Sequence, residues 1–303
     1  LRDNNYEEKL LKSELLNTLD LFTFNCCARY LLGKKIAKLP YLSIKVISWY
    51  ENQVIDKNLY KGLREVASKV KIYGAQLFLY SRAEINIIPD ENEEIFGVIP
   101  DKIIVNGPIF LPRKTRLNYA IGPSLRNEKI FDFTAYGKNK EKILVLLPYH
   151  KTGIKNVLKM ISFLKIFSGQ MYIKIHPAVS VEEVEDLLPE NSVLVNDDIY
   201  ELFETTKIII GAASGTLIEA ASLAIPSVII KNNGKLDFNP FPDYGKGIIW
   251  EEASTPEEVS RLISKFNSEL DNNFEKIITV ANEYKKMFFC RPTEEEIIKA
   301  FDL

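Results

Sequence analysis

The second half of the chain alternates short apolar runs with segments of helical periodicity. The apolar runs are KILVLLP (142–148), MYIKIHP (171–177), SVLVN (192–196), KIIIGAA (207–213) and PSVIIK (226–231). The segments with apolar residues three or four positions apart are 153–167, 180–189, 198–206, 215–224 and 254–266. Unbroken apolar runs are typical of strands buried on both faces, and strands that alternate with helices indicate a parallel, doubly wound sheet. The pattern therefore predicts a Rossmann-like domain in this half.

The first half shows the same two periods less clearly. Helical spacing covers 7–39 and 57–70, while 42–53, 71–79 and 101–110 contain strand-like runs. These segments predict a second α/β domain, whose first strands are missing if residues upstream of Leu1 have been removed. The overall prediction is an α/β protein with two Rossmann-like domains that face a cleft.

Periodicity is weakest at 112–141, and we place the linker between the two domains at 134–141. We expect an N-terminal domain at 1–136 and a C-terminal domain at 137–270. The remaining helical stretch, 271–303, is expected to pack back onto the first domain.

The composition excludes several classes of protein. Apolar residues make up 46% and charged residues 26% of the 303 residues, as in an ordinary globular protein. The net charge of −2 gives no general attraction to nucleic acid. No apolar run reaches the roughly 18 residues of a membrane span, and no signal peptide is visible. The three cysteines form neither a metal-ligand spacing nor a disulfide framework, so we expect the protein to reside in the reducing cytoplasm.

Three loops follow apolar runs of the second half and are candidates for a ligand site. Ligands of open parallel sheets bind at the carboxyl ends of the strands, near the point where the strand order reverses. The loops are PYHKTG (148–153), HPAVS (176–180) and GAASGT (211–216). In the first of them, His150 and Lys151 can add positive charge, and Tyr149 can stack on a base or simply pack.

The loop 211–216 leads directly into a helix and predicts an anion site. Its small residues expose backbone N–H groups at the helix N-terminus, and Gly215 lets a phosphate approach the backbone. The hydroxyls of Ser214 and Thr216 lie beside those groups, although Ser214 is equally explained as an N-cap. Glu219 follows on the first turns of the helix, where it either accepts hydrogen bonds from a ribose or complements the helix dipole.

His176 is one of only two histidines, and it stands at the end of an apolar run. A single histidine is more often structural than functional. At the carboxyl end of a strand near a phosphate-binding helix, however, it can donate a hydrogen bond to a phosphate or protonate a leaving group. Pro177 fixes the direction of the chain after it.

The motifs KIHP (174–177) and GAASGTLIEAASLAIPSVII (211–230) resemble the C-terminal half of GT-B glycosyltransferases of bacterial surface polysaccharide synthesis. In pattern they are similar to CMP-sugar sialyl-, polysialyl- and Kdo-transferases and to CDP-glycerol glycerophosphotransferases. The resemblance implies that His176, Pro177, Ser214, Gly215, Thr216 and Glu219 bind the phosphate and ribose of a cytidine nucleotide.

The first half resembles capsule and O-antigen transferases in the segments around Glu51–Gln53 and around Gln76. The family pattern has a histidine after the glutamine, and Leu77 stands there instead.

The resemblance implies transfer of a Kdo- or sialic-acid-like sugar from a CMP donor to a bacterial surface glycan, without a cofactor or metal. Helix N-termini and basic side chains then stabilise the departing phosphate. Glu51 is the candidate general base from the first domain, or else a solvated loop acid. Arg126 is a candidate anion-binding residue, or else part of a surface salt bridge. Whether configuration is inverted or retained stays open.

Two other functions remain open. One is a sugar-nucleotide 2-epimerase of GT-B fold, and the other is a non-catalytic nucleotide- or glycan-binding domain of a larger assembly protein. The glycan acceptor is expected to be lipid-linked in some cases, which suggests peripheral association with the inner face of the cytoplasmic membrane. The apolar segments with lysines at 10–22 and 157–167 are candidates for that contact, with core-facing helices as the favoured interpretation.

Overall fold

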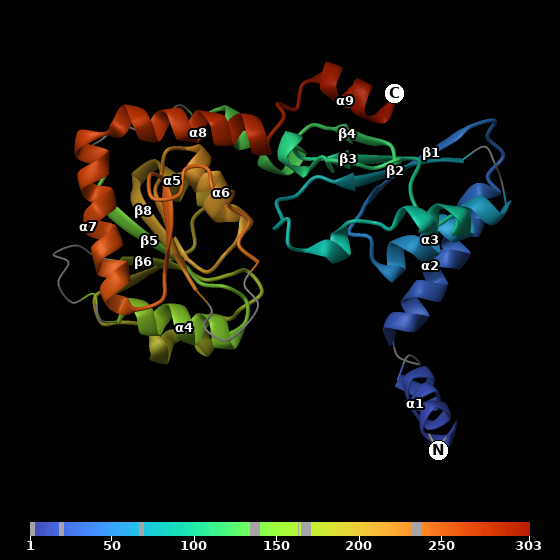
Figure 1. Cartoon of the computed structure of the whole chain (residues 1–303), viewed down its shortest axis with the longest axis horizontal. Helices are drawn as coiled ribbons and strands as arrows, with labels where there is room; N and C mark the ends of the chain where they lie inside the picture. The colour runs from blue at the N-terminus through green and yellow to red at the C-terminus, as the bar shows by residue number, and fades with distance from the viewer. Residues whose placement is uncertain are drawn as a thin grey trace.

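The computed structural model describes residues 4–17, 21–66, 70–133, 140–162, 164, 171–231 and 238–303. They form two parallel sheets that lie side by side, each with helices packed on it (Figure 1). The N-terminal sheet has the strand order β1-β2-β3-β4, and the C-terminal sheet has the order β10-β9-β8-β5-β6-β7. The prediction of an α/β protein with two Rossmann-like domains is confirmed.

The N-terminal sheet is built from four short strands and the helices next to it. Its helices are α1 (Asn4–Asn17), α2 (Leu21–Ala37) and α3 (Val54–Val66), and its strands are β1 (Ile44–Trp49), β2 (Val70–Gln76), β3 (Lys102–Val105) and β4 (Tyr119–Ile121). Four 3-10 turns lie in its loops: η1 (Ile85–Ile87), η2 (Glu91–Phe96), η3 (Pro108–Phe110) and η4 (Leu125–Phe131).

The C-terminal sheet follows the alternation that the sequence predicts. Its strands are β5 (Lys142–Leu146), β6 (Met171–Lys174), β7 (Ser192–Val195), β8 (Thr206–Gly211), β9 (Ser227–Ile230) and β10 (Trp250–Ala253). Its helices are α4 (Lys151–Ile161), α5 (Ile199–Thr205), α6 (Gly215–Ser222), α7 (Pro256–Asn272) and α8 (Phe274–Phe288), with 3-10 turns η5 (Val181–Glu183) and η6 (Glu185–Leu187). Figure 1 shows α4 below this sheet and α5, α6 and α8 above it.

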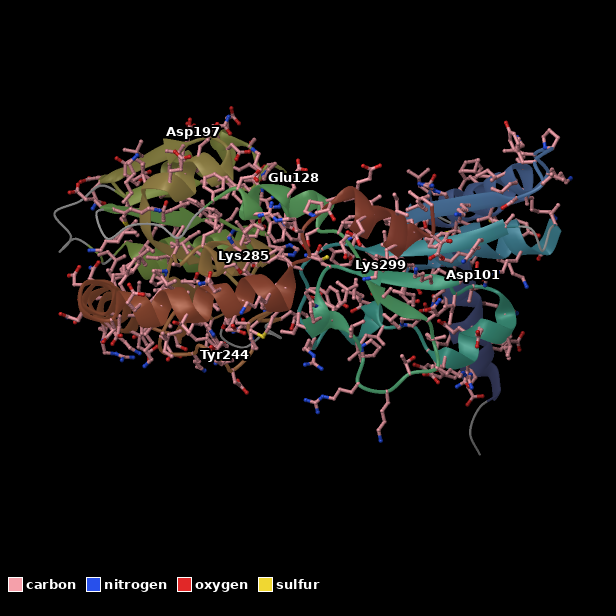
Figure 2. The ribbon with its side chains drawn as sticks, turned by 90° about the horizontal axis from the view of Figure 1, so that it is seen from above. Asp101, Glu128, Asp197, Tyr244, Lys285 and Lys299 are labelled. Carbon is pink, nitrogen blue, oxygen red and sulfur yellow. The ribbon has the colours of Figure 1, made fainter. Side chains whose placement is uncertain are left out.

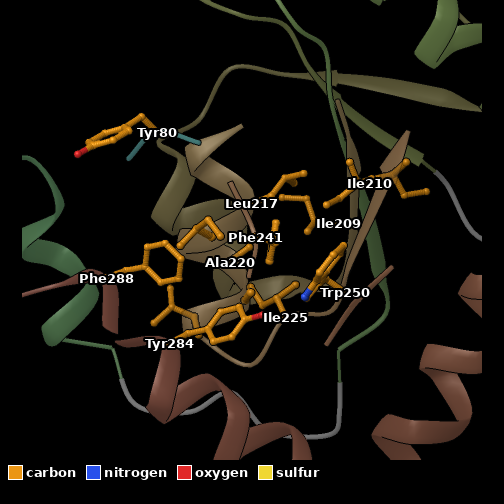
Figure 3. Packing of buried hydrophobic residues seen from close by; sticks show 14 of the residues in the cluster. Tyr80, Ile209, Ile210, Leu217, Ala220, Ile225, Phe241, Trp250, Tyr284 and Phe288 are labelled. Atoms are coloured by element: carbon orange, nitrogen blue, oxygen red, sulfur yellow. The ribbon is translucent and has the colours of Figure 1, made fainter. Parts of the chain in front are cut away.

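The core of the C-terminal domain forms around the central strand β8. Ile208, Ile209 and Ile210 have no exposed surface, because helices cover both faces of the strand. Figure 3 shows the two isoleucines Ile209 and Ile210 beside Leu217 of α6. Burial of each such side chain contributes about 1.5–3 kcal/mol relative to leaving it exposed, so this strand anchors the domain.

The two domains meet where the loops after β2 and β3 contact the C-terminal domain. Asn106, after β3, donates a hydrogen bond from Nδ2 to the carbonyl oxygen of Phe288 at 3.0 Å. The ring of Phe110 lies 4.5 Å from that of Tyr80 and 5.8 Å from that of Phe288. Ser81 donates its hydroxyl to the Asn239 carbonyl oxygen at 3.0 Å. Figure 3 shows Tyr80 at the rim of the aromatic cluster that includes Phe288.

The last helix, α9 (Glu294–Phe301), packs on the N-terminal sheet. Ala300 and Phe301 are buried against Tyr73 and Ile104 of β2 and β3. Asp302 accepts hydrogen bonds from Lys71 at 2.8 Å and Lys102 at 2.9 Å. Figure 2 shows the consequence from above, with Lys299 over the N-terminal domain and Lys285 on the C-terminal one. The stretch 271–303 thus contains two helices with different neighbours.

Several elements differ from the sequence predictions. The acidic helix expected at 180–189 consists of the two 3-10 turns η5 and η6. The helix expected at 153–167 ends at Ile161, and residues 165–167 lie outside the described residues. Strands β4 and β10 carry no strong apolar run and were not predicted. Most of the expected linker, 134–139, also lies outside the described residues.

The two segments considered for membrane contact have opposite environments. Val157, Leu158 and Ile161 of α4 are buried in the core, as the favoured interpretation requires. Leu10 and Leu16 of α1 are 52% and 68% exposed, so the core-facing interpretation is wrong for that segment. Among the described residues, no helix combines the length and apolarity that crossing a bilayer requires.

Candidate functional site

The strand order reverses between β5 and β8, and this point is where a ligand site is expected. From β5 the chain moves outward through β6 to β7 and then returns to β8 on the other side of β5. Leu146 and Gly211 are paired at the carboxyl ends of these two strands. The loops 147–150 and 212–214 therefore diverge from the same edge, which is where doubly wound sheets bind ligands. Two of the three candidate loops lie at this reversal, and the loop that contains His176 follows the adjacent strand β6.

The N-terminus of α6 presents donors without acceptors. Ser214 is the N-cap residue, with extended φ and ψ of −158° and 158°, but its side chain makes no capping hydrogen bond. Within the parts of the chain that the structure describes, the backbone N–H groups of Gly215 and Thr216 have no acceptor. Ser214 thus occupies the N-cap position without making the capping hydrogen bond, and its hydroxyl is available to a ligand together with those groups. Such an arrangement is typical of an anion site.

Leu79 of the N-terminal domain lies against this helix terminus. A Cβ atom added to Gly215 would come within 2.9 Å of the Leu79 Cβ, closer than non-bonded carbons approach. Leu79 follows β2, so the loop after that strand reaches across to the start of α6. Gly215 is required here for the close approach of the two domains, a role that the sequence alone does not reveal.

His176 is held by a local hydrogen bond that assigns its ring nitrogens. The Ala178 backbone N–H donates to His176 Nδ1 at 3.1 Å, so the neutral ring carries its proton on Nε2. The His176 ring lies 5.5 Å from that of Tyr149, which lies 3.6 Å from that of His150. All three side chains are exposed, as is Pro177. The structure thus brings these three rings together, with a donor nitrogen directed away from the loop backbone.

Lys151 is paired with an acid of the same domain. Its Nζ lies 3.0 Å from a carboxylate oxygen of Glu183, and its side chain is 76% exposed. This pairing lowers the pKa of Glu183, and the carboxylate compensates part of the charge that Lys151 presents to an anion.

Glu219 is held in a polar cluster between three elements. Tyr200 of α5 donates its hydroxyl to Glu219 Oε2 at 2.5 Å. Burial raises the pKa of Glu219, and the hydrogen bonds from Tyr200 and Asn127 and the charge of Arg126 oppose that rise. Asn127 is 3% exposed, and its Oδ1 has no hydrogen-bond partner among the described residues. The structure therefore brings Arg126 to Glu219, and it adds Tyr200 and Asn127, which the sequence analysis missed.

Glu51 lies at the end of the edge strand β1, in a loop that satisfies its carboxylate. Trp49 Nε1 donates to Glu51 Oε1 at 2.7 Å, and Gln53 Nε2 donates to Oε2 at 2.6 Å. Asp56, whose pKa is raised by burial, accepts from the backbone N–H groups of Glu51 and Gln53. The adjoining cavity of about 270 Å³ is lined by Arg29, Ser48, Trp49, Glu51, Gln53, Ile55, Asp56 and Leu59, all from the N-terminal domain.

The residues around Gln76 have a structural role rather than a catalytic one. Gln76 donates from Nε2 to the Ile87 carbonyl oxygen at 2.8 Å and is 1% exposed. Leu77 is 5% exposed and belongs to the cluster under α9. A histidine at position 77 would therefore face the core under α9.

A second cavity, of about 460 Å³, lies between β4 and the helices α8 and α9. Its three lysines are each engaged: Lys102 with Asp302, Lys286 with Glu283 and Lys299 with Glu296. The cavity is larger than the one beside Glu51, but its lysines are already paired with carboxylates.

Comparison of the coordinates with solved structures identifies the architecture. The chain is similar to a glycosyltransferase from Rickettsia africae ESF-5, with 14% sequence identity and a TM-score of 0.56 over 94% of this chain and 82% of that one. It is similar to MnaA of S. aureus in a co-structure with UDP, with 14% identity and a TM-score of 0.58 over 90% and 79% of the two chains. The fold is GT-B.

A further GT-B match is the UDP-GlcNAc 2-epimerase from Neisseria meningitidis bound to UDP-GlcNAc, with 14% identity and a TM-score of 0.53 over 93% and 82% of the two chains. No protein-family model matches the sequence, and no curated protein matches it. The GT-B architecture is therefore established by structure, with the reversal of strand order at β5 and β8 in its C-terminal domain.

Proposed function

We propose that this chain is a glycosyltransferase that uses a nucleotide sugar. The observation that carries the proposal is the N-terminus of α6, where the N–H groups of Gly215 and Thr216 and the Ser214 hydroxyl lack acceptors at the reversal of the strand order. A diphosphate or phosphate of a donor fits this site by charge and by hydrogen bonding. Neighbours in structure that include a glycosyltransferase and proteins bound to UDP or UDP-GlcNAc support the class.

The donor in this proposal is a CMP-sugar, with a Kdo- or sialic-acid-like sugar transferred to a bacterial surface glycan. The Nε2–H of His176 donates to the departing phosphate. Glu219 binds ribose hydroxyls once the Tyr200 hydroxyl no longer donates to its carboxylate. Glu51 takes the proton of the acceptor hydroxyl after leaving its hydrogen bonds with Trp49 and Gln53. No metal takes part, because the helix N-terminus and the imidazole stabilise the leaving group.

A thermal-shift screen against CMP, CDP, UDP, GDP and ADP tests the proposal. A ligand at about 100 times its Kd stabilises the folded state by about 2.7 kcal/mol, which raises the melting temperature measurably. CMP and CDP are expected to raise it more than the other three nucleotides. The Ser214→Ala variant is the control, and it should lose most of the shift. Equal shifts from all five would refute the cytidine preference, and no shift from any would refute the nucleotide-sugar class.

A sugar-nucleotide 2-epimerase is the second candidate, and the similarity to the Neisseria meningitidis enzyme favours it. The products separate the two. A transferase releases free nucleotide in proportion to the acceptor consumed, whereas an epimerase changes the donor sugar when no acceptor is present. A non-catalytic binding domain would give a thermal shift with neither product.

A further inference from the structure

The segment from Leu21 to Tyr50 contains no acidic residue, although the whole chain has a net charge of −2. Its cations are Arg29, Lys34, Lys35, Lys38 and Lys45. Lys34 is paired with Glu65, and Lys45 donates to the Asp302 carbonyl oxygen. Lys35 and Lys38 form no ion pair with any acid in the described ranges, whereas Arg29 lines the cavity beside Glu51 and Asp56. This segment is therefore a local excess of positive charge on a weakly acidic protein.

The helix in this segment, α2, is apolar on two opposite faces. One face, with Cys26, Gly33 and Ala37 buried, packs on α3 so closely that a Cβ on Gly33 would lie 2.4 Å from the Leu59 carbonyl oxygen. On the other face Phe24 is 69% exposed and Leu31 is 56% exposed. A helix that is apolar on all sides is normally buried on all sides, so we expect the exposed face of α2 to contact another structure.

The apolar surface continues beyond the helix. Leu21, Leu32 and Leu39 are 76%, 42% and 43% exposed, and Leu42 is fully exposed at 100% in the loop before β1. Lys35 and Lys38 lie within the same stretch, at the C-terminal end of α2 and just after it. We call Phe24, Leu31, Lys35, Lys38 and Leu42 the α2 surface.

We propose that the α2 surface binds an anionic lipid bilayer, with α2 lying in the plane of the interface. Its apolar side chains enter the boundary between headgroups and acyl chains, and the lysines reach the headgroup phosphates. Charge selects this occupant over a second copy of the chain. Two copies packed through the same surface would place the lysines in an interface to which residues 21–50 contribute no acid, whereas anionic lipids complement them. Figure 1 shows α1 and α2 below the N-terminal sheet and apart from the C-terminal domain, so this orientation leaves the strand ends of β5 and β8 away from the bilayer.

Vesicle flotation tests the proposal with the whole protein. Vesicles of phosphatidylglycerol and phosphatidylcholine, compared with phosphatidylcholine alone, should bind the protein at least about tenfold more strongly at 0.1 M salt. Binding should weaken at 1 M salt, where the Debye length falls from about 10 Å to about 3 Å. The double variant Lys35→Glu/Lys38→Glu should lose about 30-fold or more in binding, and Phe24→Ser/Leu31→Ser should lose a comparable factor.

Matched controls lie in the C-terminal domain. Lys155 and Lys159 are exposed lysines on α4, and Lys155→Glu/Lys159→Glu should bind like the wild type. Val181 and Leu187 are 46% and 43% exposed, and Val181→Ser/Leu187→Ser should also bind normally. Circular dichroism and the melting temperature should be unchanged in all four variants, because every substituted side chain is exposed.

Three results would overturn the proposal. The first is no binding to the anionic vesicles, and the second is equal binding by the Lys35→Glu/Lys38→Glu variant. The third is a concentration-dependent dimer, seen by light scattering, that Phe24→Ser/Leu31→Ser dissolves, because it would make a second copy the occupant. The assay contains no nucleotide or sugar. Its failure is therefore distinguishable from failure of the proposed glycosyltransferase activity.

Discussion

The two sheets differ in how completely they are covered. In the C-terminal sheet, Ile208 and Ile210 of the central strand have no exposed surface. In the N-terminal sheet, the edge strand β1 leaves Ile47 48% exposed and Trp49 46% exposed. Strands buried on both faces produce unbroken apolar runs, whereas an edge strand with one bare face produces a weaker signal. The difference explains why the second half of the sequence was easier to interpret than the first.

The loops at the carboxyl ends of the two sheets differ in the same way. Around Gly215 and Thr216, donors have no partner in the described structure and are ready for a ligand. Around Glu51, both carboxylate oxygens already accept hydrogen bonds from the same loop. The donors of the proposed anion site in the C-terminal domain are thus already free, while the group proposed as base in the N-terminal domain must first exchange its partners.

The largest expected effect is on turnover, and it tests whether the chemistry depends on the C-terminal domain. His176→Ala should reduce release of nucleotide from the donor by about 10²–10⁴-fold, because a positioned proton donor contributes that much. The melting temperature should stay within about 1 °C of the wild type, since His176 is exposed and the hydrogen bond of its side chain is local. Turnover at the wild-type level would remove His176 from the mechanism.

Core substitutions compare the two sheets directly. Ile210→Ala should lower the free energy of unfolding by about 2–5 kcal/mol, whereas Ile47→Ala should change it by less than about 0.5 kcal/mol. The chain has two tryptophans, Trp49 in the first domain and Trp250 in the second, so urea denaturation can be followed in each domain by fluorescence. Replacing one tryptophan by Phe isolates the other signal. A comparable loss in both variants would mean that β1 is covered in solution.

The contact between the domains is tested at a single glycine. Gly215→Ala should cost about 1–3 kcal/mol, because its Cβ would come within 2.9 Å of the Leu79 Cβ. Leu79→Gly removes the atom on the other side of the contact, so the double variant should recover part of the loss and part of any lost nucleotide affinity. A double variant no better than Gly215→Ala alone would show that the domains do not meet at this point.

The smallest expected effect is a change in the pH dependence of stability. Burial raises the pKa of Glu219 from its ordinary 4.5, so between the unfolded and the folded pKa the folded state holds a proton that the unfolded state has released. Stability therefore falls as the pH rises from about 4.5 through the folded pKa. Tyr200→Phe removes a hydrogen bond to the carboxylate and should deepen that fall by about 1 kcal/mol.

Urea denaturation between pH 4 and pH 8 measures this effect, with Glu219→Gln as the reference that lacks the titration. The Tyr200→Phe and wild-type curves should converge at the acid end, where Glu219 is protonated in both states. A constant offset at every pH would instead indicate a loss of packing by Tyr200.

The strands that the sequence predicted are those whose apolar runs identify them without information from the rest of the fold. KIIIGAA and KILVLLP became β8 and β5, and GAASGT became the start of α6, because apolar runs and small residues act locally. Strand β10, WEEA, was missed because its charged residues are paired from outside the strand. Glu251 and Glu252 lie 3.6 Å and 3.7 Å from Lys246.

The parts of the site that were missed depend on contacts across the fold. Tyr200 reaches Glu219 over 19 residues of chain, and it sits in a helix whose pattern only indicates packing. Leu79 reaches Gly215 from another domain, and no local motif records such a contact. Arg126 was a candidate on charge alone, and its proximity to Glu219 comes from the turn η4 packing near α6.

The position of α9 has a consequence for biosynthesis. One face of the first sheet is covered by Ala300 and Phe301, which are translated after every strand of the C-terminal sheet. Until α9 emerges from the ribosome, Tyr73 and Ile104 therefore lack the side chains that cover them, although their strands were translated long before. The N-terminal domain can reach its final packing only once α9 is available, whereas the strands β5–β10 and the helices α4–α8 are already complete by residue 288.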